Sequence, residues 1–268
     1  MVQLLLCFLC VLTGHSYAQD YTFKPLKTIS KTTRWMEVDK MKHLYLIEDD
    51  HTLSKYSPDG LLLYQFNENS LGQISYVDIS NPLRVLVYYD DYATVLFLDR
   101  TLSEIQRHDL SILDISQVQA LGTASDNTIW IFDNNSYTLK KIDSQNNVLA
   151  ESTDLNLLLS EEIIPNRLTE VNSRVYLNSP NLGILVFDIF GNYIKTIEIP
   201  QLDYFQLYEG QLFYVEKKIF QAYHLLSFQT KKIELPFVKD NLEQISIAQE
   251  RIYIKYPNKI NIIDLKQK

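Results

Sequence analysis

The residues with the clearest potential for chemistry are aspartates that recur after short apolar runs. Asp49 and Asp50 follow one run, Asp90 and Asp91 follow the next, and Asp133 follows a third. A row of carboxylates could bind a cation such as Ca²⁺. An aspartate directly after an apolar run can also accept hydrogen bonds from the backbone N–H groups of a turn. Because repeated units lie apart in space, we interpret each aspartate as a cap of its own turn.

The histidines beyond residue 18 form no recognisable catalytic pattern; they are His43, His51, His108 and His224. His51 follows two aspartates and is the strongest candidate for a general base. The sequence contains neither His-Glu-x-x-His nor Gly-x-Ser-x-Gly, so it predicts neither a metalloprotease helix nor a nucleophile elbow. We therefore predict no catalytic residues, no metal site and no cofactor.

The chain opens with an apolar segment. Residues 2–13 are almost wholly apolar, and Ser16-Tyr17-Ala18 places small residues at the two positions that a signal peptidase reads. We predict a secretory signal peptide over residues 1–18, cut between Ala18 and Gln19. This segment is too short to cross a hydrocarbon core, which needs about 20 apolar residues in a helix. We expect an exported chain without a membrane span after cleavage.

Both cysteines, Cys7 and Cys10, lie in this first segment. The mature chain then has no cysteine, which excludes disulfides, thiolate nucleophiles and cysteine-bound metals. An exported protein without disulfides is more typical of a bacterial envelope than of an animal secretory pathway. We predict a periplasmic, outer-envelope or secreted protein of a bacterium.

The charge balance excludes one class of partner. The formal net charge is −8 at pH 7, whereas a nucleic-acid binder needs a basic stripe. Basic residues occur instead as short pairs at the ends of expected hairpins, namely Lys140-Lys141, Lys217-Lys218 and Lys231-Lys232. We expect the partner to be a protein or an extended ligand of the cell envelope.

The elements that position these residues follow from a repeat. Six short apolar runs begin at Leu44, Val85, Ile129, Val175, Leu212 and Ile252, so their spacings are 41, 44, 46, 37 and 40 residues. A period of about 40 residues made of short strands is typical of a β-propeller blade. The fold prediction is all-β: a six-bladed β-propeller of four-stranded antiparallel blades over residues 19–268.

The sixth unit needs a strand from elsewhere in the chain. Its outermost strand would begin near position 271, but the sequence ends at Lys268. Residues Tyr21–Ile29 form a spare strand, and pairing it with Ile260–Leu265 would complete the sixth blade. Pro25 suits an outer edge strand, which need not donate every hydrogen bond. Closure of this kind removes the exposed edges of an open array.

One unit carries a family resemblance. Ile129–Asn135 followed by Leu139–Asp143 resembles the NHL-type repeat of six-bladed propellers, and Phe187-Asp188 with Gly191 is similar. This resemblance, to the NHL-repeat and TolB-like propellers, covers nearly the whole mature chain. It implies a central channel in which Glu, Asn and Asp side chains of some relatives hold a cation. On that alternative the chain is a metal-dependent hydrolase or lyase, with candidate ligands Glu37, Asp78, Glu170 and Asn172. We interpret these four as ordinary channel or turn residues.

The favoured function is an exported, non-catalytic propeller that acts as a protein-interaction scaffold or ligand-binding module. Its site is predicted where the inner strands begin, at the mouth of the channel, because aromatic and arginine side chains there carry contact energy well. The candidate binding residues are Arg34, Trp35, Tyr76, Gln119, Arg167, Tyr204 and Gln244. A further alternative is a glycan or small-molecule binder at this aromatic mouth.

Overall fold

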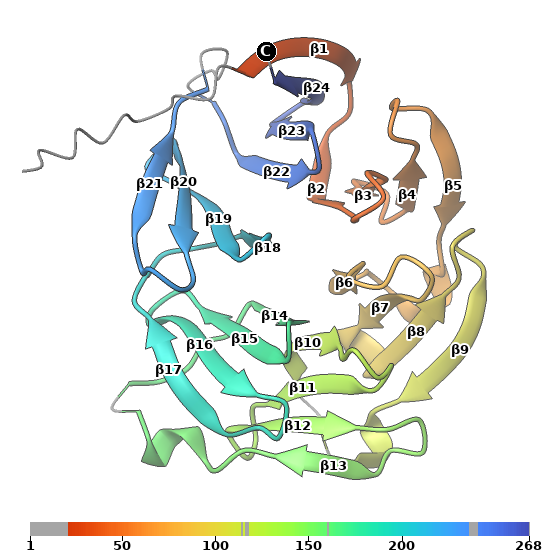
Figure 1. Ribbon diagram of the computed structural model, residues 1–268. Helices are drawn as coiled ribbons and strands as arrows, with labels where there is room; N and C mark the ends of the chain where they lie inside the picture. Colours follow the sequence, from red (N-terminus) through yellow and green to blue (C-terminus); the bar gives the residue numbers. More distant parts are fainter. Residues whose placement is uncertain (1–20, 114, 116–117, 160, 236–240, 268) are drawn as a thin grey trace, which may run out of the picture.

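The computed structural model describes residues 21–113, 115, 118–159, 161–235 and 241–267. The predicted signal peptide, with both cysteines, lies outside the described residues. The described strands form six four-stranded antiparallel sheets arranged in a ring (Figure 1), which confirms the predicted six-bladed, all-β propeller.

Each blade begins with an inner strand beside the channel and ends with an edge strand on the rim (Figure 1). Blades one to three comprise β2 (Thr33–Val38), β3 (Leu44–Glu48), β4 (Leu53–Tyr56) and β5 (Leu62–Phe66); β6 (Tyr76–Asp78), β7 (Val85–Tyr89), β8 (Thr94–Leu98) and β9 (Glu104–Asp109); and β10 (Val118–Thr123), β11 (Ile129–Asp133), β12 (Thr138–Ile142) and β13 (Val148–Glu151).

Blades four to six follow the same order. They comprise β14 (Arg167–Val171), β15 (Arg174–Ser179), β16 (Gly183–Asp188) and β17 (Tyr193–Ile197); β18 (Phe205–Tyr208), β19 (Gln211–Glu216), β20 (Ile219–His224) and β21 (Thr230–Ile233); and β22 (Gln244–Ala248), β23 (Arg251–Tyr256), β24 (Lys259–Gln267) and β1 (Tyr21–Ile29). Short 3-10 turns join some strands: η1 (Asn69–Leu71), η2 (Asp90–Tyr92), η3 (Ser111–Leu113) and η4 (Leu155–Leu157).

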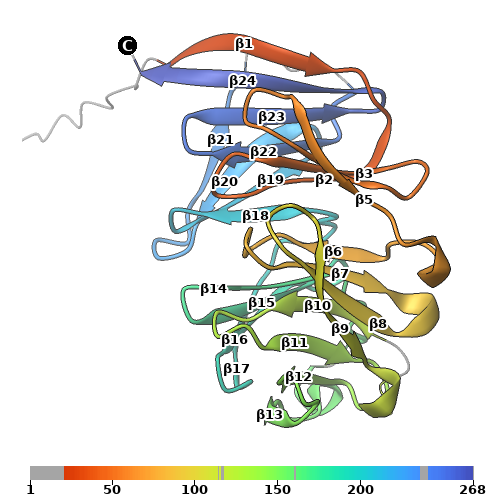
Figure 2. The same cartoon turned by 90° about the vertical axis from the view of Figure 1, so that its right-hand side faces the viewer.

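The N-terminal strand closes the ring as predicted. β1 pairs antiparallel with β24, from Tyr21 opposite Gln267 to Ile29 opposite Ile260, and Figure 2 shows the two strands side by side. The register shifts between Pro25 and Lys27, where proline cannot donate to the ladder. The last blade therefore joins both ends of the described chain, and this strand protects the edge of β24.

The hydrophobic core lies between neighbouring blades. Every residue of β7 and β11 is buried, because both faces of a middle strand are covered by adjacent sheets. Blades three and four approach closely at Gly122, where a Cβ atom would lie 2.7 Å from the Leu168 carbonyl oxygen. Rigid packing of this kind fixes the positions of the inner strands.

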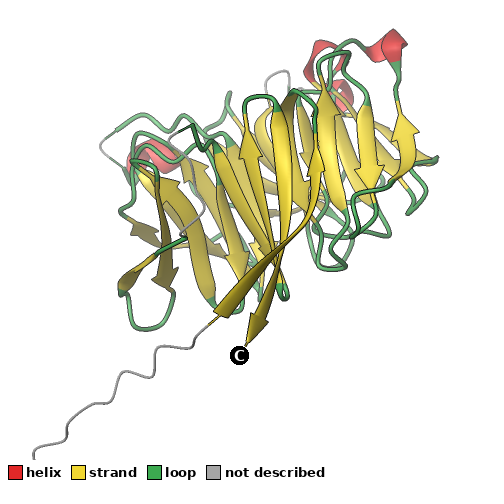
Figure 3. Ribbon diagram, turned by 90° about the horizontal axis from the view of Figure 1, so that it is seen from above, coloured by secondary structure: helices red, strands yellow, loops and turns green. Residues whose placement is uncertain are grey.

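All inner strands run in the same direction along the channel, since every blade starts at the centre and ends at the rim. Figure 3 shows the strands running between the two faces of the disc, with loops gathered at both faces. The first residues of the inner strands therefore surround one mouth of the channel, and their last residues surround the other. No helix among the described residues is long and apolar enough to cross a membrane.

Candidate functional site

The first residues of the inner strands enclose a cavity of about 410 Å³, which we call the N-terminal mouth. The structure brings six of the seven predicted binding residues together there: Arg34, Trp35, Tyr76, Arg167, Tyr204 and Gln244. Asn166, Asp203, Glu243 and Lys255 also contribute to its wall. The first three of these directly precede predicted residues in the sequence, so that adjacency is the signal that could have found them.

Gln119 is the seventh predicted residue, and it is not among the residues that line this cavity. It is exposed at a register shift between Val118 and Ala120, where β10 has one more residue than its partner strand β11. A β-bulge of this kind changes the direction of the side chain that it carries. Sequence spacing does not reveal such a local shift.

Hydrogen bonds between blades hold the aromatic and amide walls of the N-terminal mouth. The Gln244 side-chain amide donates to the Met36 carbonyl at 2.8 Å, and the Tyr204 hydroxyl lies 3.2 Å from the Ser246 hydroxyl. Tyr76 donates from blade two to the Leu168 carbonyl of blade four at 3.1 Å. Burial raises the pKa of both tyrosine hydroxyls, so they stay neutral hydrogen-bonding groups. The walls are therefore preorganised.

Charged side chains lie at the outer edge of the N-terminal mouth. Arg34 is exposed, and its Nη1 lies 2.7 Å from His51 Nδ1 and 3.2 Å from Gln73 Oε1. Since a guanidinium group only donates, His51 Nδ1 is an acceptor here and is occupied by this contact. Lys255 forms an ion pair with Glu243 at 2.7 Å. The histidine considered as a general base therefore helps to orient an arginine.

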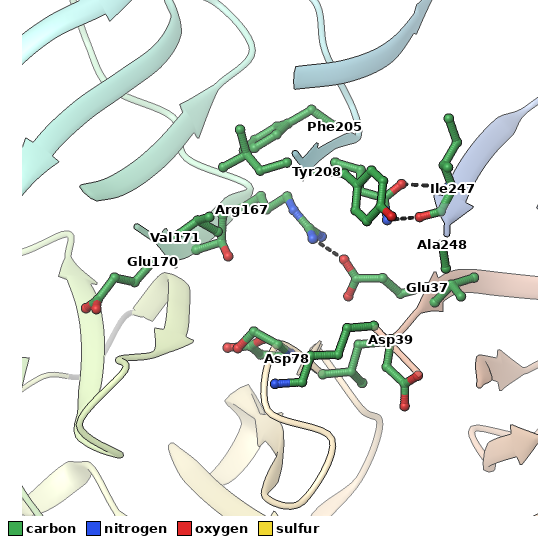
Figure 4. Close-up of a pocket in the computed structure, with 17 residues that line it drawn as sticks. Glu37, Asp39, Asp78, Arg167, Glu170, Val171, Phe205, Tyr208, Ile247 and Ala248 are labelled. Atoms are coloured by element: carbon green, nitrogen blue, oxygen red, sulfur yellow. Dashed lines mark hydrogen bonds and ion pairs between the residues drawn. The ribbon is translucent and has the colours of Figure 1, made fainter. Parts of the chain in front are cut away.

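Arg167 separates the N-terminal mouth from the opposite one. Its guanidinium group forms an ion pair with Glu37 of β2, on blade one, across the channel (Figure 4). Its central carbon lies 4.9 Å from the ring centre of Tyr204, which is a cation–π distance. Arg167 Nε is buried and has no hydrogen-bond partner among the described residues. Burial raises the pKa of the Glu37 carboxyl, and the Arg167 charge acts in the opposite direction.

The last residues of the inner strands enclose a smaller cavity of about 230 Å³, which we call the C-terminal mouth (Figure 4). Three of the four candidate metal ligands, Glu37, Asp78 and Glu170, line it together with Asp39. Asn172 instead lies exposed in the turn between β14 and β15, with a positive φ of 51°. The inner strands thus bring acids together that are far apart in sequence.

Three acids of the C-terminal mouth, Glu37, Asp78 and Glu170, are engaged in joining blades. Asp78 of blade two accepts a hydrogen bond from the Thr123 backbone N–H of blade three at 2.6 Å. Glu170 of blade four accepts from Trp130 Nε1 of blade three at 2.7 Å. Within the described part of the chain, no group of three or more His, Cys, Asp or Glu side chains could hold a metal ion.

The recurring aspartates act within their own turns where the structure shows their bonds. Asp50 accepts from the Thr52 backbone N–H at 3.1 Å, and this bond lowers the pKa of the Asp50 carboxyl. Asp133 accepts from the Asn135 N–H at 3.0 Å and from Lys140 at 2.6 Å. Asp90 accepts from the Asp91 backbone N–H at 3.0 Å within its turn, and also from the hydroxyl of Ser75, which precedes the neighbouring strand β6. These contacts agree with the interpretation of the aspartates as turn caps.

Comparison with solved structures supports the fold. A catalytically inactive virginiamycin B lyase from Staphylococcus aureus, solved with quinupristin, matches 92% of this chain and 100% of its own, at 12% identity and a TM-score of 0.61. BamB from Moraxella catarrhalis matches 92% of this chain and 99% of its own, at 10% identity and a TM-score of 0.54. The Pan2 WD40 domain of Neurospora crassa matches 93% and 97%, at 9% identity and a TM-score of 0.60.

These identities are too low to carry function from one propeller to another, since one fold hosts many unrelated sites. No protein-family model matches the sequence, and no curated protein sequence matches it. The comparisons therefore establish the propeller architecture, and the closer resemblance to NHL-type repeats stays a prediction.

Proposed function

We propose that this chain is an exported, non-catalytic binding protein of the bacterial envelope, whose propeller binds a ligand or a segment of a protein partner at the N-terminal mouth. The observation that carries the proposal is the convergence of Trp35, Tyr76 and Tyr204 with Arg34, Arg167 and Gln244 on one cavity. A concave site with aromatic walls and a few fixed polar groups is the usual form of a binding pocket.

The chemistry of the mouth favours a ligand with both flat apolar faces and hydrogen-bonding edges. Aromatic rings contribute apolar contact, while arginine and amide groups orient polar atoms. Sugar rings and peptide side chains combine these two features. Because the walls are fixed by hydrogen bonds between blades, little ordering free energy is lost when the ligand binds.

The engagement of the acids supports a role without catalysis. Glu37, Asp78 and Glu170 each have a charged or hydrogen-bonded partner that holds the ring together. Recruiting any of them as a base or a metal ligand would break a contact between blades. A hydrolase or lyase remains the competing proposal, and stoichiometric metal in elemental analysis of the purified protein, with turnover of a substrate, would favour it.

Tryptophan fluorescence tests the site directly. Trp35 lines the mouth, whereas Trp130 is fully buried between blades. Titration with a panel of envelope oligosaccharides and peptides is expected to change the Trp35 emission for at least one compound. Trp35→Ala removes this reporter, so its binding is measured by isothermal titration calorimetry beside the wild type. The variant should bind that compound about tenfold or more weakly, since loss of a buried aromatic contact costs about 2 kcal/mol.

The matched control is Phe190→Ala, because Phe190 is 68% exposed on a turn of blade four away from the mouth. This variant should bind the compound with unchanged affinity. Equal losses in both variants, or conversion of the compound into a product, would contradict the proposed binding role.

Export makes a separate prediction. Expressed in a bacterium with its own first residues, the protein should be recovered outside the cytoplasm with Gln19 as its N-terminal residue. Replacing Leu5 and Leu9 by aspartate should abolish export, because the apolar segment would lose its hydrophobicity. Cell fractionation and N-terminal sequencing measure both outcomes, and an uncut cytoplasmic chain would refute export.

A further inference from the structure

We propose that the edge strand of blade one, β5, binds an extended segment of a partner protein as a fifth strand. This surface lies on the rim of the ring, away from both mouths (Figure 1), so the inference is independent of the proposed ligand site. β5 is the last strand of its sheet, and its outer backbone N–H and C=O groups face away from β4. An extended peptide can pair with such an edge.

The side chains of this edge are unusually apolar and exposed. Leu61, Leu62, Leu63 and Tyr64 are 61%, 49%, 42% and 41% exposed, and they follow one another without a charge. Native edge strands normally carry charged residues or proline that prevent pairing with other chains. The other five edges of this ring follow that rule: β1 has Lys24, Pro25 and Lys27, β9 has Glu104 and Arg107, β13 has Glu151, β17 has Lys195, and β21 has Lys231 and Lys232.

β5 is also held firmly at both ends. Arg251 of blade six donates to the Pro58 carbonyl in the turn that precedes β5. After β5, the Asn67 amide donates to the Thr52 hydroxyl at 3.1 Å, and Gln65 within the strand donates to Ser54 at 3.0 Å. An edge that is fixed before binding reduces the ordering cost of pairing. The edge is therefore ready to accept a strand without rearrangement.

The size of the edge favours an extended peptide over a second copy of this chain. β5 has five residues and spans about 17 Å at about 3.3 Å per residue. Two rigid convex rims meeting along so short a line would bury far less than the roughly 800 Å² per partner of a stable dimer. A flexible extended segment can pair with β5 and also fold its apolar side chains over both faces of the exposed leucines.

The test uses linear peptides selected from a random phage-displayed library on the mature protein. Leu62→Lys places a charge on this edge. Its matched control is Val148→Lys on β13, which is 48% exposed and occupies the same place beside a register shift in its own blade. Selected peptides are expected to bind the wild type and Val148→Lys equally, and Leu62→Lys about tenfold or more weakly.

Backbone pairing adds a second readout. In an extended peptide, alternate N–H groups point to opposite edges, and only one edge faces β5. Methylation of every second nitrogen should therefore abolish binding when the methyl groups lie on the edge that faces β5. Methylation of the other set of nitrogens should leave binding unchanged. Equal melting temperatures of the two lysine variants show that both are folded. Selected peptides that bind Leu62→Lys normally, a selection that yields no binder, or a wild-type dimer that Leu62→Lys dissociates would each overturn the proposal.

Discussion

Replacing Arg167 by methionine is expected to lower the free energy of unfolding by about 3–5 kcal/mol. The Arg167 and Glu37 side chains are only 13% and 8% exposed, so the variant would leave a buried carboxylate without its counter-charge. Urea unfolding at neutral pH measures the change. Arg34→Met is the control, because Arg34 lies exposed on the rim of the same mouth and its loss should cost less than about 0.5 kcal/mol.

The loss of unfolding free energy in Arg167→Met should depend on pH. Burial already raises the pKa of the Glu37 carboxyl, and removal of Arg167 takes away the charge that opposes this shift. A carboxyl group with a raised pKa in the folded state stabilises the fold below its unfolded pKa and loses that contribution as the pH rises through the folded value. The variant should therefore be closer to the wild type near pH 4 than near pH 8.

A second substitution separates charge burial from packing. Glu37→Gln in the Arg167→Met background removes the unpaired charge, so the double variant should be more stable than Arg167→Met alone. The two substitutions could instead lower the free energy of unfolding additively and equally at every pH. In that case Arg167 would act only by filling space.

Removal of strand β1 is expected to have the largest effect on the fold as a whole. A chain that begins at Ser30 would lose all eight register pairs with β24 and the buried side chain of Ile29. It would also expose the long edge of β24 to other chains. The loss should approach the total stability of a domain, about 5–15 kcal/mol, so we expect an unfolded or aggregated product.

The control is a chain that begins at Tyr21, which keeps β1 and should melt as a chain of residues 19–268 does. Circular dichroism and sedimentation distinguish the two products. A synthetic peptide of residues 19–29 should restore folding to the shortened chain if pairing with β24 is the cause. A shortened chain that melts within a few degrees of the control would show that the ring is stable without this strand.

The repeat and the closing strand were predictable because they depend on local pattern. Each blade encodes its strands as short apolar runs between turn residues, and the spare strand at Tyr21–Ile29 has the bounds that the sequence predicted. The mouth was largely predictable for a related reason. Since every blade enters at its inner strand, residues at equivalent positions, such as Trp35 and Tyr76, face the same end of the channel.

Only the tertiary structure decided how the channel is divided. Arg167 and Glu37 are 130 positions apart in sequence, and no local pattern indicates that they meet. Their contact depends on ring closure, which places blades one and four on facing sides of the channel. The bulge at Gln119 and the open edge at β5 likewise depend on register and burial, because the same residue types occur elsewhere in paired or covered positions. The sequence alone therefore determined the blades, their number and the strand that closes them, through local periodicity, whereas the ring geometry decided which side chains meet and which edge stays open.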